Sequence, residues 1–401
     1  MLMRLTPFFQ RFKTGAVAVA LMGATLSHAA VQVLINPGDQ GEQSRFAVYS
    51  AWKDAAESAL RHEKLGPVQV QLSTDATADL GLTRSRIPDI FIAPAHVIGS
   101  AVRFGYTPVL GFDKSVQAVL VVPKDSAITS LASAQGKRLG LPLQDSVVTY
   151  LLRGEVNAAN TTLKRHFANL YETRYQEALL PCLQLLRCDA VAVERAVAER
   201  WLAAGQPLKI VMETRAAPAL SVALKDGVKP GPQQLHDALV EALGQAAGGS
   251  ALANSGTPVA LAKKDFDYVS TLGYFTPRSL PGVALVEAQE VMQLMQAGAT
   301  YVDTRTEAEF KAGHAKGALW LPYVEKSHKE ADFNPQKDQF DLTRLSSNKG
   351  AALIFACNGA ECWKSFKASS VAKAAGYARV YWFRGGFPEW RSASLPVVGA
   401  S

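Results

Sequence analysis

Short apolar runs alternate with longer amphipathic segments along most of this chain, and this alternation restricts the folds that the chain can adopt. Val31–Ile35, Val68–Leu72 and Asp89–Pro94 have the length and composition of strands. Residues 44–63 and 97–104 carry apolar side chains at helical spacing. Strands and helices that alternate in this way favour an α/β fold built on a parallel sheet.

A second group of alternating elements follows the first. The chain crosses between the two groups near 111–116 and returns near 213–221. Two α/β lobes joined by two crossing segments would form a clamshell with a ligand cleft between the lobes. The elements expected in the second lobe are a short helix over Leu131–Lys137 and strands over Gln117–Pro123, Arg138–Leu141, Cys188–Val193 and Leu208–Met212.

Length and composition divide the chain further. A chain of 401 residues is too long for one ordinary core, so two or more domains are expected. Between Gly244 and Gly282 the composition becomes rich in Gly, Ala, Ser and Pro. This change predicts a domain over 30–274, a linker over 275–282 and a second domain over 283–401. The net charge of +7 comes without a concentrated Lys/Arg stripe, which argues against nucleic acid and is compatible with small anions.

Residues 1–29 have the features of a secretory signal peptide. A basic start, an apolar run over Gly15–Leu26 and small residues before a cleavage site near Ala29 predict export, with an uncleaved anchor as the alternative. Export would make the four cysteines oxidisable. For Cys182 and Cys188, a disulfide and two buried thiols both remain open, and their spacing suits no metal.

The start of one predicted helix is a candidate anion site. Asp145 and Ser146 precede a helix that extends to about Asn157, and Ser146 and Thr149 lie where free N–H groups and the helix dipole attract an oxyanion. Simple capping of the helix by Ser146 is the alternative. Asp145 counts against an anion there. Arg215, next to the return crossing, would supply a counter-charge or lie solvated on the surface.

The clamshell region resembles the phosphate and phosphonate family of ABC-transporter periplasmic binding proteins over residues 31–274. The resemblance implies a two-lobed, type II-like binding-protein fold, a periplasmic location, a small-anion ligand such as a sulfur or phosphorus oxyanion, and an ABC permease as a possible partner. It is carried by Ile92–His96, Phe104–Val109, Ile128–Gly140 and Leu186–Ala190. Residue by residue, it assigns the ligand site to the Asn36–Gly38 turn, to Ala93–His96, to Ser115, and to the segment Asp145–Thr149 with Ser146 and Thr149.

The last third contains a cysteine on a turn from strand to helix. Ala351–Phe355 has the composition of a buried strand, the chain breaks at Cys357, Asn358 and Gly359, and a helical pattern resumes at Ser365. Backbone N–H groups of such a loop, together with the start of the following helix, stabilise a thiolate. The residues therefore indicate nucleophilic sulfur chemistry at Cys357.

The sequence on both sides of this cysteine, over residues 283–398, resembles the rhodanese superfamily. The resemblance implies an α/β domain with a parallel sheet, in which Cys357 takes up sulfane sulfur as a persulfide and passes it to a thiol or cyanide; it implies no cofactor and no metal. One signature comprises Asp303, Arg305, Glu309, Phe310, Gly313, His314, Gly317 and Ala318, and the other spans Gly376–Trp390.

The resemblance also suggests roles for the surrounding residues. Asp303 and Arg305 are expected to pair and brace the active-site loop, and His314 to be structural. The family places Arg or a similar residue and then Ser five and six positions after the cysteine, whereas Lys364 and Ser365 follow by seven and eight. The loop is therefore longer, and thiosulfate is one candidate donor among others. The expected loop residues are Asn358, Gly359, Ala360, Glu361, Trp363 and Ser365, with Lys364 as the nearby cation.

Cys362 adds a second thiol to this loop. It would form a disulfide with Cys357, resolve a persulfide on Cys357, or pack as an inert side chain. The sequence predicts an exported sulfurtransferase coupled to an oxyanion-binding domain. The alternative is a periplasmic solute-binding or sensor protein whose rhodanese module is a thiol-redox or docking element without turnover.

Overall fold

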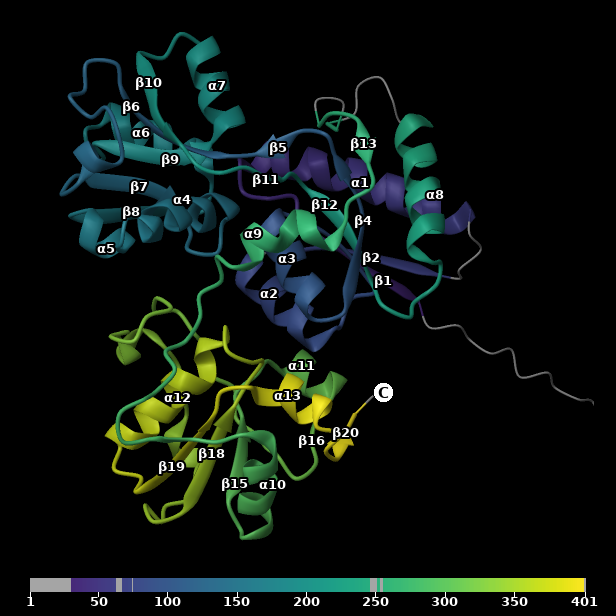
Figure 1. Cartoon of the computed structure of the whole chain (residues 1–401), viewed down its shortest axis with the longest axis vertical. Coiled ribbons are helices and arrows are strands. Elements are labelled where there is room, and N and C mark those ends of the chain that lie inside the picture. Colours follow the sequence, from purple (N-terminus) through teal and green to yellow (C-terminus); the bar gives the residue numbers. More distant parts are fainter. Residues whose placement is uncertain (1–29, 63–66, 74, 246–250, 253–254, 400–401) are drawn as a thin grey trace, which may run out of the picture.

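The computed structural model describes residues 30–62, 67–73, 75–245, 251–252 and 255–399, which form two α/β lobes and a C-terminal domain packed beneath them (Figure 1). The segment for which a signal peptide is predicted, 1–29, lies outside these residues. Within the described ranges, no helix is long and apolar enough to cross a membrane.

The first lobe is a mixed six-stranded sheet in the order β13-β4-β12-β3-β1-β2. Strand β1, between β3 and the edge strand β2, places Val33 and Ile35 against the helices on one face and Leu34 against those on the other, because side chains alternate along a strand. Its strands are β1 (Val31–Ile35), β2 (Val68–Leu72), β3 (Ile90–Ala93), β4 (Tyr106–Phe112), β12 (Ser221–Lys225) and β13 (Pro258–Val259). Its helices are α1 (Glu42–His62), α2 (Ala76–Ser85), α3 (Ala95–Arg103), α8 (Pro232–Gln245), η3 (Lys263–Phe266) and α9 (Asp267–Ser270).

The second lobe is a five-stranded sheet in the order β10-β6-β9-β7-β8. The helix expected over Leu131–Lys137 is wrong in extent, because only one 3-10 turn forms there. The strands are β6 (Ala118–Pro123), β7 (Arg138–Pro142), β8 (Asn169–Thr173), β9 (Ala190–Glu194) and β10 (Leu208–Glu213). The helices are η1 (Ala132–Ala134), α4 (Val147–Ala158), α5 (Leu163–His166), η2 (Gln176–Ala178), α6 (Leu179–Gln184) and α7 (Arg195–Ala203).

The two crossing segments pair with each other between the lobes. Strand β5 (Ser115–Val116) runs antiparallel to β11 (Ala217–Pro218), so the outgoing and returning chains form a two-stranded connection. Both lobes share one apolar core at their contact, in which Phe91 of the first lobe and Leu141 of the second are buried. The clamshell predicted from the sequence is therefore confirmed as the architecture of this region.

The C-terminal domain has the predicted parallel sheet, in the order β14-β19-β18-β15-β17. Its strands are β14 (Ala284–Leu285), β15 (Thr300–Asp303), β17 (Leu319–Trp320), β18 (Ala352–Ala356) and β19 (Arg379–Phe383), and β16 (His314–Ala315) pairs separately with β20 (Val397–Val398). Its helices are α10 (Ala288–Gln296), α11 (Glu307–Ala312), η4 (Pro335–Lys337), η5 (Leu342–Arg344), α12 (Trp363–Ala374) and α13 (Gly386–Ser392).

Strand β18 is buried along its whole length in the middle of this sheet. Ile354 packs with α10 and α13 on one face, and Leu353 and Phe355 pack with α12 on the other. A parallel strand that is covered on both faces is apolar throughout, which explains the unbroken run of apolar residues before Cys357. The cysteine thus follows the fully buried central strand of the domain.

Candidate active site and ligand pocket

Cys357 lies directly after β18, at the carboxyl end of the parallel sheet, and its side chain is buried. Its Sγ is 3.1 Å from the Oγ of Ser365 in the first turn of α12. The indole Nε1 of Trp382 donates to the same Oγ at 3.1 Å. Because the Ser365 oxygen already accepts from Trp382, its own hydrogen is free to point at the sulfur and to stabilise a thiolate.

The loop after Cys357 presents unused backbone donors. In the described part of the chain, the amides of Asn358, Gly359, Ala360 and Glu361 donate to no protein acceptor. Consecutive free amides in a turn attract negative charge. The loop therefore has the donors that a thiolate or an oxyanion at this position requires.

The two pairs of cysteines are both joined as disulfides. Cys357 is bonded to Cys362, and Cys182 to Cys188, which leaves no free cysteine among the residues that the structure describes. A disulfide-bonded Cys357 is not a nucleophile, so reduction has to precede any attack by this sulfur.

Lys364 lies at the start of α12 and is half-buried. Burial opposes ionisation of Glu309, but the Lys364 ammonium and hydrogen bonds from Thr306 hold the pKa of that carboxyl below its usual value. Lys364 therefore places positive charge beside the loop and shares it with a buried carboxylate. A point charge of this kind lacks the two-pronged fit of an arginine to an oxyanion.

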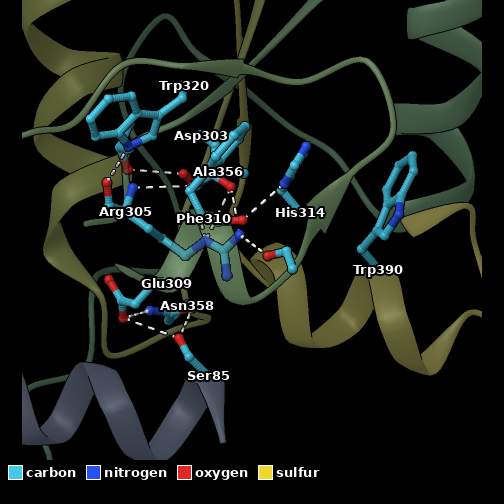
Figure 2. Close-up of polar contacts among 12 residues, drawn as sticks. Ser85, Asp303, Arg305, Glu309, Phe310, His314, Trp320, Ala356, Asn358 and Trp390 are labelled. Atoms are coloured by element: carbon cyan, nitrogen blue, oxygen red, sulfur yellow. Dashed lines mark hydrogen bonds and ion pairs between the residues drawn. The ribbon is translucent and has the colours of Figure 1, made fainter. Parts of the chain in front are cut away.

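Asp303 and Arg305 form a buried two-pronged ion pair. Arg305 Nε donates to Asp303 Oδ1 at 2.9 Å, and Nη2 donates to Oδ2 at 2.6 Å (Figure 2). Arg305 also donates to the carbonyl of Gly313 at 2.8 Å. The strand before the loop is bonded directly to Thr304 and not to this ion pair. The Oγ1 of Thr304 donates to the carbonyl of Ala356 at 2.8 Å.

His314 makes its ring contacts with Phe310. Its ring stacks on Phe310 with centroids 3.7 Å apart, and its Nδ1 lies 2.9 Å from the Phe310 carbonyl (Figure 2). These contacts close the turn after α11 and give His314 a structural position.

The active-site loop packs directly against the first lobe. Glu361 Oε2 accepts from Arg103 of α3 at 2.5 Å and lies 3.6 Å from Arg84 of α2. The Oγ of Ser85, at the end of α2, lies 3.1 Å from Glu309 Oε1 and 3.3 Å from Asn358 Oδ1, and its one hydrogen is shared between these two acceptors (Figure 2). No local sequence signal reveals these partners, because they lie far from the loop in the chain. The first lobe therefore covers the loop that follows Cys357.

The segment predicted as a linker also contacts the loop. Thr276 donates through both its amide and its Oγ1 to the carbonyl of Ala360, each at 2.8 Å. Trp363 Nε1 donates to the carbonyl of Tyr274 at 2.7 Å. Residues 274–276 are thus part of the packing around the active site and not a free tether.

A cavity of about 660 Å³ lies between the two lobes. Several residues expected at the ligand site line it, namely Asn36, Gly38, His96 and Ser146. The further lining residues are Asp39, Arg45, Asp75, Ala76, Thr77, Pro94, Leu143, Gln144, Asp145, Val147, Glu172, Arg174, Tyr175, Lys326 and His328. The last two belong to the C-terminal domain, so three parts of the chain meet at this cavity.

Four of the expected ligand residues do not line the cavity. Ser115 is exposed in β5, where it pairs with β11. Arg215 is exposed, and its guanidinium stacks on Tyr268. Ala93 is buried inside β3, and Thr149 donates to the carbonyl of Pro142 at 3.1 Å. These side chains are engaged by the connection between the lobes or by their own lobe, so they are not available to a ligand in this cavity.

The cavity is not uniformly basic. Asp145 is buried beside it, and although burial disfavours its charge, the Nζ of Lys329 at 2.6 Å and 2.7 Å holds its pKa below the usual value. Burial raises the pKa of Asp39 and of Glu172. The sequence analysis named Asp145 but missed Asp39 and Glu172, and also the guanidinium groups of Arg45 and Arg174. Only Asp39 carried a signal, since it ends the turn that begins at Asn36.

His96 is neutral at the cavity wall. Burial lowers the pKa of His96 to about 4, and its Nε2 lies 2.8 Å from the Asp145 carbonyl, to which it donates. Its Nδ1 is therefore an acceptor, and no hydrogen-bond partner for it lies in the described chain. This link also joins the first lobe to the second.

Comparisons with known proteins agree with this division of the chain. The family model of the periplasmic substrate-binding protein of phosphonate ABC transporters matches residues 48–262, and that of the rhodanese-like domain matches residues 287–393. Thiosulfate sulfurtransferase 18 of Arabidopsis thaliana is 31% identical over 122 residues, which are 29% of this chain and 83% of that protein. Thiosulfate sulfurtransferase 16, chloroplastic, of the same plant is 33% identical over 106 residues, which are 26% of this chain and 83% of that protein.

Among solved structures, a Xanthomonas citri protein bound to ATP is similar to the two lobes. The TM-score is 0.50 at 17% identity, and the match covers 61% of this chain and 97% of that one. At this identity the likeness shows the shared fold alone.

Proposed function

Because this chain belongs to the phosphonate family of ABC-transporter periplasmic substrate-binding proteins over residues 48–262 and carries a rhodanese-like domain at 287–393, we propose that it is an exported protein with two linked activities. The two lobes capture a small anion, and the C-terminal domain transfers sulfane sulfur through Cys357. An ABC permease is the corresponding partner of the lobes, and a thiol or cyanide is the sulfur acceptor.

The environment of Cys357 is the observation that supports sulfur transfer best. Once the disulfide with Cys362 is reduced, the Cys357 thiolate is stabilised by the Ser365 hydroxyl and the free loop amides. It attacks the outer sulfur of a sulfane donor such as thiosulfate, the sulfur–sulfur bond of the donor breaks, and sulfite leaves. The acceptor then attacks the outer sulfur of the Cys357 persulfide, and the thiolate is regenerated.

The disulfide itself favours a second candidate, a thiol-redox element. Cys362 lies close enough to bond to Cys357. If a persulfide forms on Cys357, the Cys362 thiolate attacks the inner sulfur, hydrosulfide leaves, and the observed disulfide is formed. An external dithiol then has to reduce that disulfide before another cycle begins.

Thiocyanate formation from thiosulfate and cyanide tests the role of Cys357. We expect the reduced full-length protein to be active and Cys357→Ser to fall to background, while Cys362→Ser retains turnover and no longer needs prior reduction. Equal rates for the parent and Cys357→Ser would exclude this sulfur as the nucleophile. Release of hydrosulfide by the parent but not by Cys362→Ser would favour the redox element.

A further inference from the structure

We propose that the ligand cavity is a composite site, in which Lys326, His328 and Lys329 of the C-terminal domain supply the positive charge that an anion needs. The proposal rests on the proposed role of the lobes in anion binding. It goes beyond that role because it places part of the ligand site in the sulfurtransferase-like domain.

The charges contributed by the lobes alone do not favour an anion. Among the described residues, the lobes line the cavity with four carboxylates and two guanidinium groups, which leaves an excess of two negative charges when all are ionised. Crowded carboxylates of this kind repel an oxyanion. The carboxylates are those of Asp39, Asp75, Asp145 and Glu172, and the guanidinium groups are those of Arg45 and Arg174.

The C-terminal domain cancels this excess of negative charge. Lys329 forms a buried ion pair with both carboxylate oxygens of Asp145, at 2.6 Å and 2.7 Å. Lys326 and His328 line the cavity themselves, and His328 Nε2 lies 3.6 Å from Glu172 Oε2. With these side chains in place the lining is neutral, or positive when His328 is protonated, and an anion is no longer opposed.

Asp145 is the point at which all three parts of the chain meet. Its carboxylate accepts from Thr77 of the first lobe and from Lys329 of the C-terminal domain, while Asp145 itself precedes α4 of the second lobe. His96 of the first lobe donates to its carbonyl at 2.8 Å. The same acid that would repel a ligand thus holds the two lobes and the C-terminal domain together at the cavity.

The helix after the active-site loop holds the contributing segment in position. Lys367 of α12 is fully buried, and its Nζ contacts the Ser327 carbonyl at 3.1 Å, the Ser327 Oγ at 2.9 Å and the Glu325 carboxylate at 2.5 Å. Asp338 accepts from the amides of Lys326 and Ser327, each at 2.6 Å. The cationic side chains therefore reach the cavity from a segment that is already ordered, which lowers the entropy cost of binding.

Calorimetric titration of the full-length protein tests the proposal, with phosphate, methylphosphonate, sulfate and thiosulfate as the probes. We expect the parent to bind at least one of them, and Lys326→Gln/His328→Gln to bind it more weakly by on the order of tenfold or more, since two charged or polar contacts are lost. Lys316→Gln is the matched control, because Lys316 is exposed in the same domain and does not line the cavity.

The outcomes separate the two levels of the proposal. Equal affinity in Lys326→Gln/His328→Gln and in Lys316→Gln would overturn the composite site and leave anion binding by the lobes intact. Absence of binding to the parent would overturn anion binding and the composite site with it.

A second pair of variants tests the counter-charge directly. Lys329→Met leaves the Asp145 carboxylate unpaired, and we expect it to bind the same anion more weakly than the parent does. Lys329→Met/Asp145→Asn removes both charges, so its affinity should return toward that of the parent. If the double variant binds no better than Lys329→Met, Lys329 does not act as the counter-charge of Asp145.

Discussion

Cys357 is held in place by close backbone contact with the glycine pair that follows β19. The amide of Phe387 donates to the Cys357 carbonyl at 2.8 Å. Gly386, just before it, has a φ of +61°, and a Cβ there would collide with the Cys357 carbonyl and lie 2.9 Å from the Gly359 nitrogen. The absence of a side chain at 386 therefore allows the second signature to pack on the cysteine loop.

Gly386→Ala should destabilise the C-terminal domain by about 2–4 kcal/mol, because it adds a steric clash to a left-handed backbone. Calorimetry of thermal unfolding measures the change. Gly376→Ala is the matched control, since Gly376 has a φ of +91° with open space around it. The control should lose only about 1 kcal/mol. Equal losses in both variants would contradict the importance of the contact with Cys357.

At the scale of elements, α12 serves two sites at once. Its first turn brings Ser365 to the Cys357 sulfur, and two residues later Lys367 anchors the segment that carries Lys326 to the cavity. Burial lowers the pKa of Lys367, and the Glu325 carboxylate opposes this effect. The helix is therefore a physical connection between the sulfur site and the ligand cavity.

Lys367→Met should release residues 325–329 and destabilise the domain by about 3–5 kcal/mol, because the buried Glu325 carboxylate loses its partner. Hydrogen exchange of the full-length protein measures the release as faster exchange of amides 325–329. Lys373→Met, in the last turn of the same helix, should leave these amides protected. Unchanged protection in Lys367→Met would show that Lys367 is not needed to hold the segment in place.

At the scale of the whole molecule, the C-terminal domain docks with its reactive loop toward the first lobe. Helix α11 lies beside α2 (Figure 1). The loop acid Glu361 contacts Arg103 and Arg84. Cys357 is only 1% exposed in this arrangement. Access of a sulfur donor to the reduced thiol is therefore expected to depend on the docking of the two modules.

Glu361→Gln should weaken this docking by about 1 kcal/mol and raise the undocked population about fivefold, since the two arginines lose their carboxylate partner. The rate at which iodoacetamide alkylates Cys357 in the reduced protein measures that population. Glu307→Gln, on the exposed side of α11, is the matched control and should react at the parental rate. An unchanged rate in Glu361→Gln would show that the thiol is reached without undocking.

The sequence by itself determined the features that depend on neighbours along the chain. The alternation of elements predicted the α/β lobes, and the apolar run before Cys357 predicted a central strand and a loop. The two signatures on either side of that loop identified the rhodanese-like domain. These features can be predicted from the sequence because periodicity, turn residues and helix starts are local properties of the chain.

Only the tertiary structure decided what surrounds the two sites. Lys329 pairs with Asp145 across 184 residues, and Arg103 meets Glu361 across 258. Each side chain has the character of a solvated surface charge when only its neighbours in sequence are considered. Burial of such a charge is favourable only when an opposite charge is brought to it, and that partner is chosen by the packing of lobes and domain. The contribution of the C-terminal domain to the ligand cavity was for this reason absent from the sequence analysis.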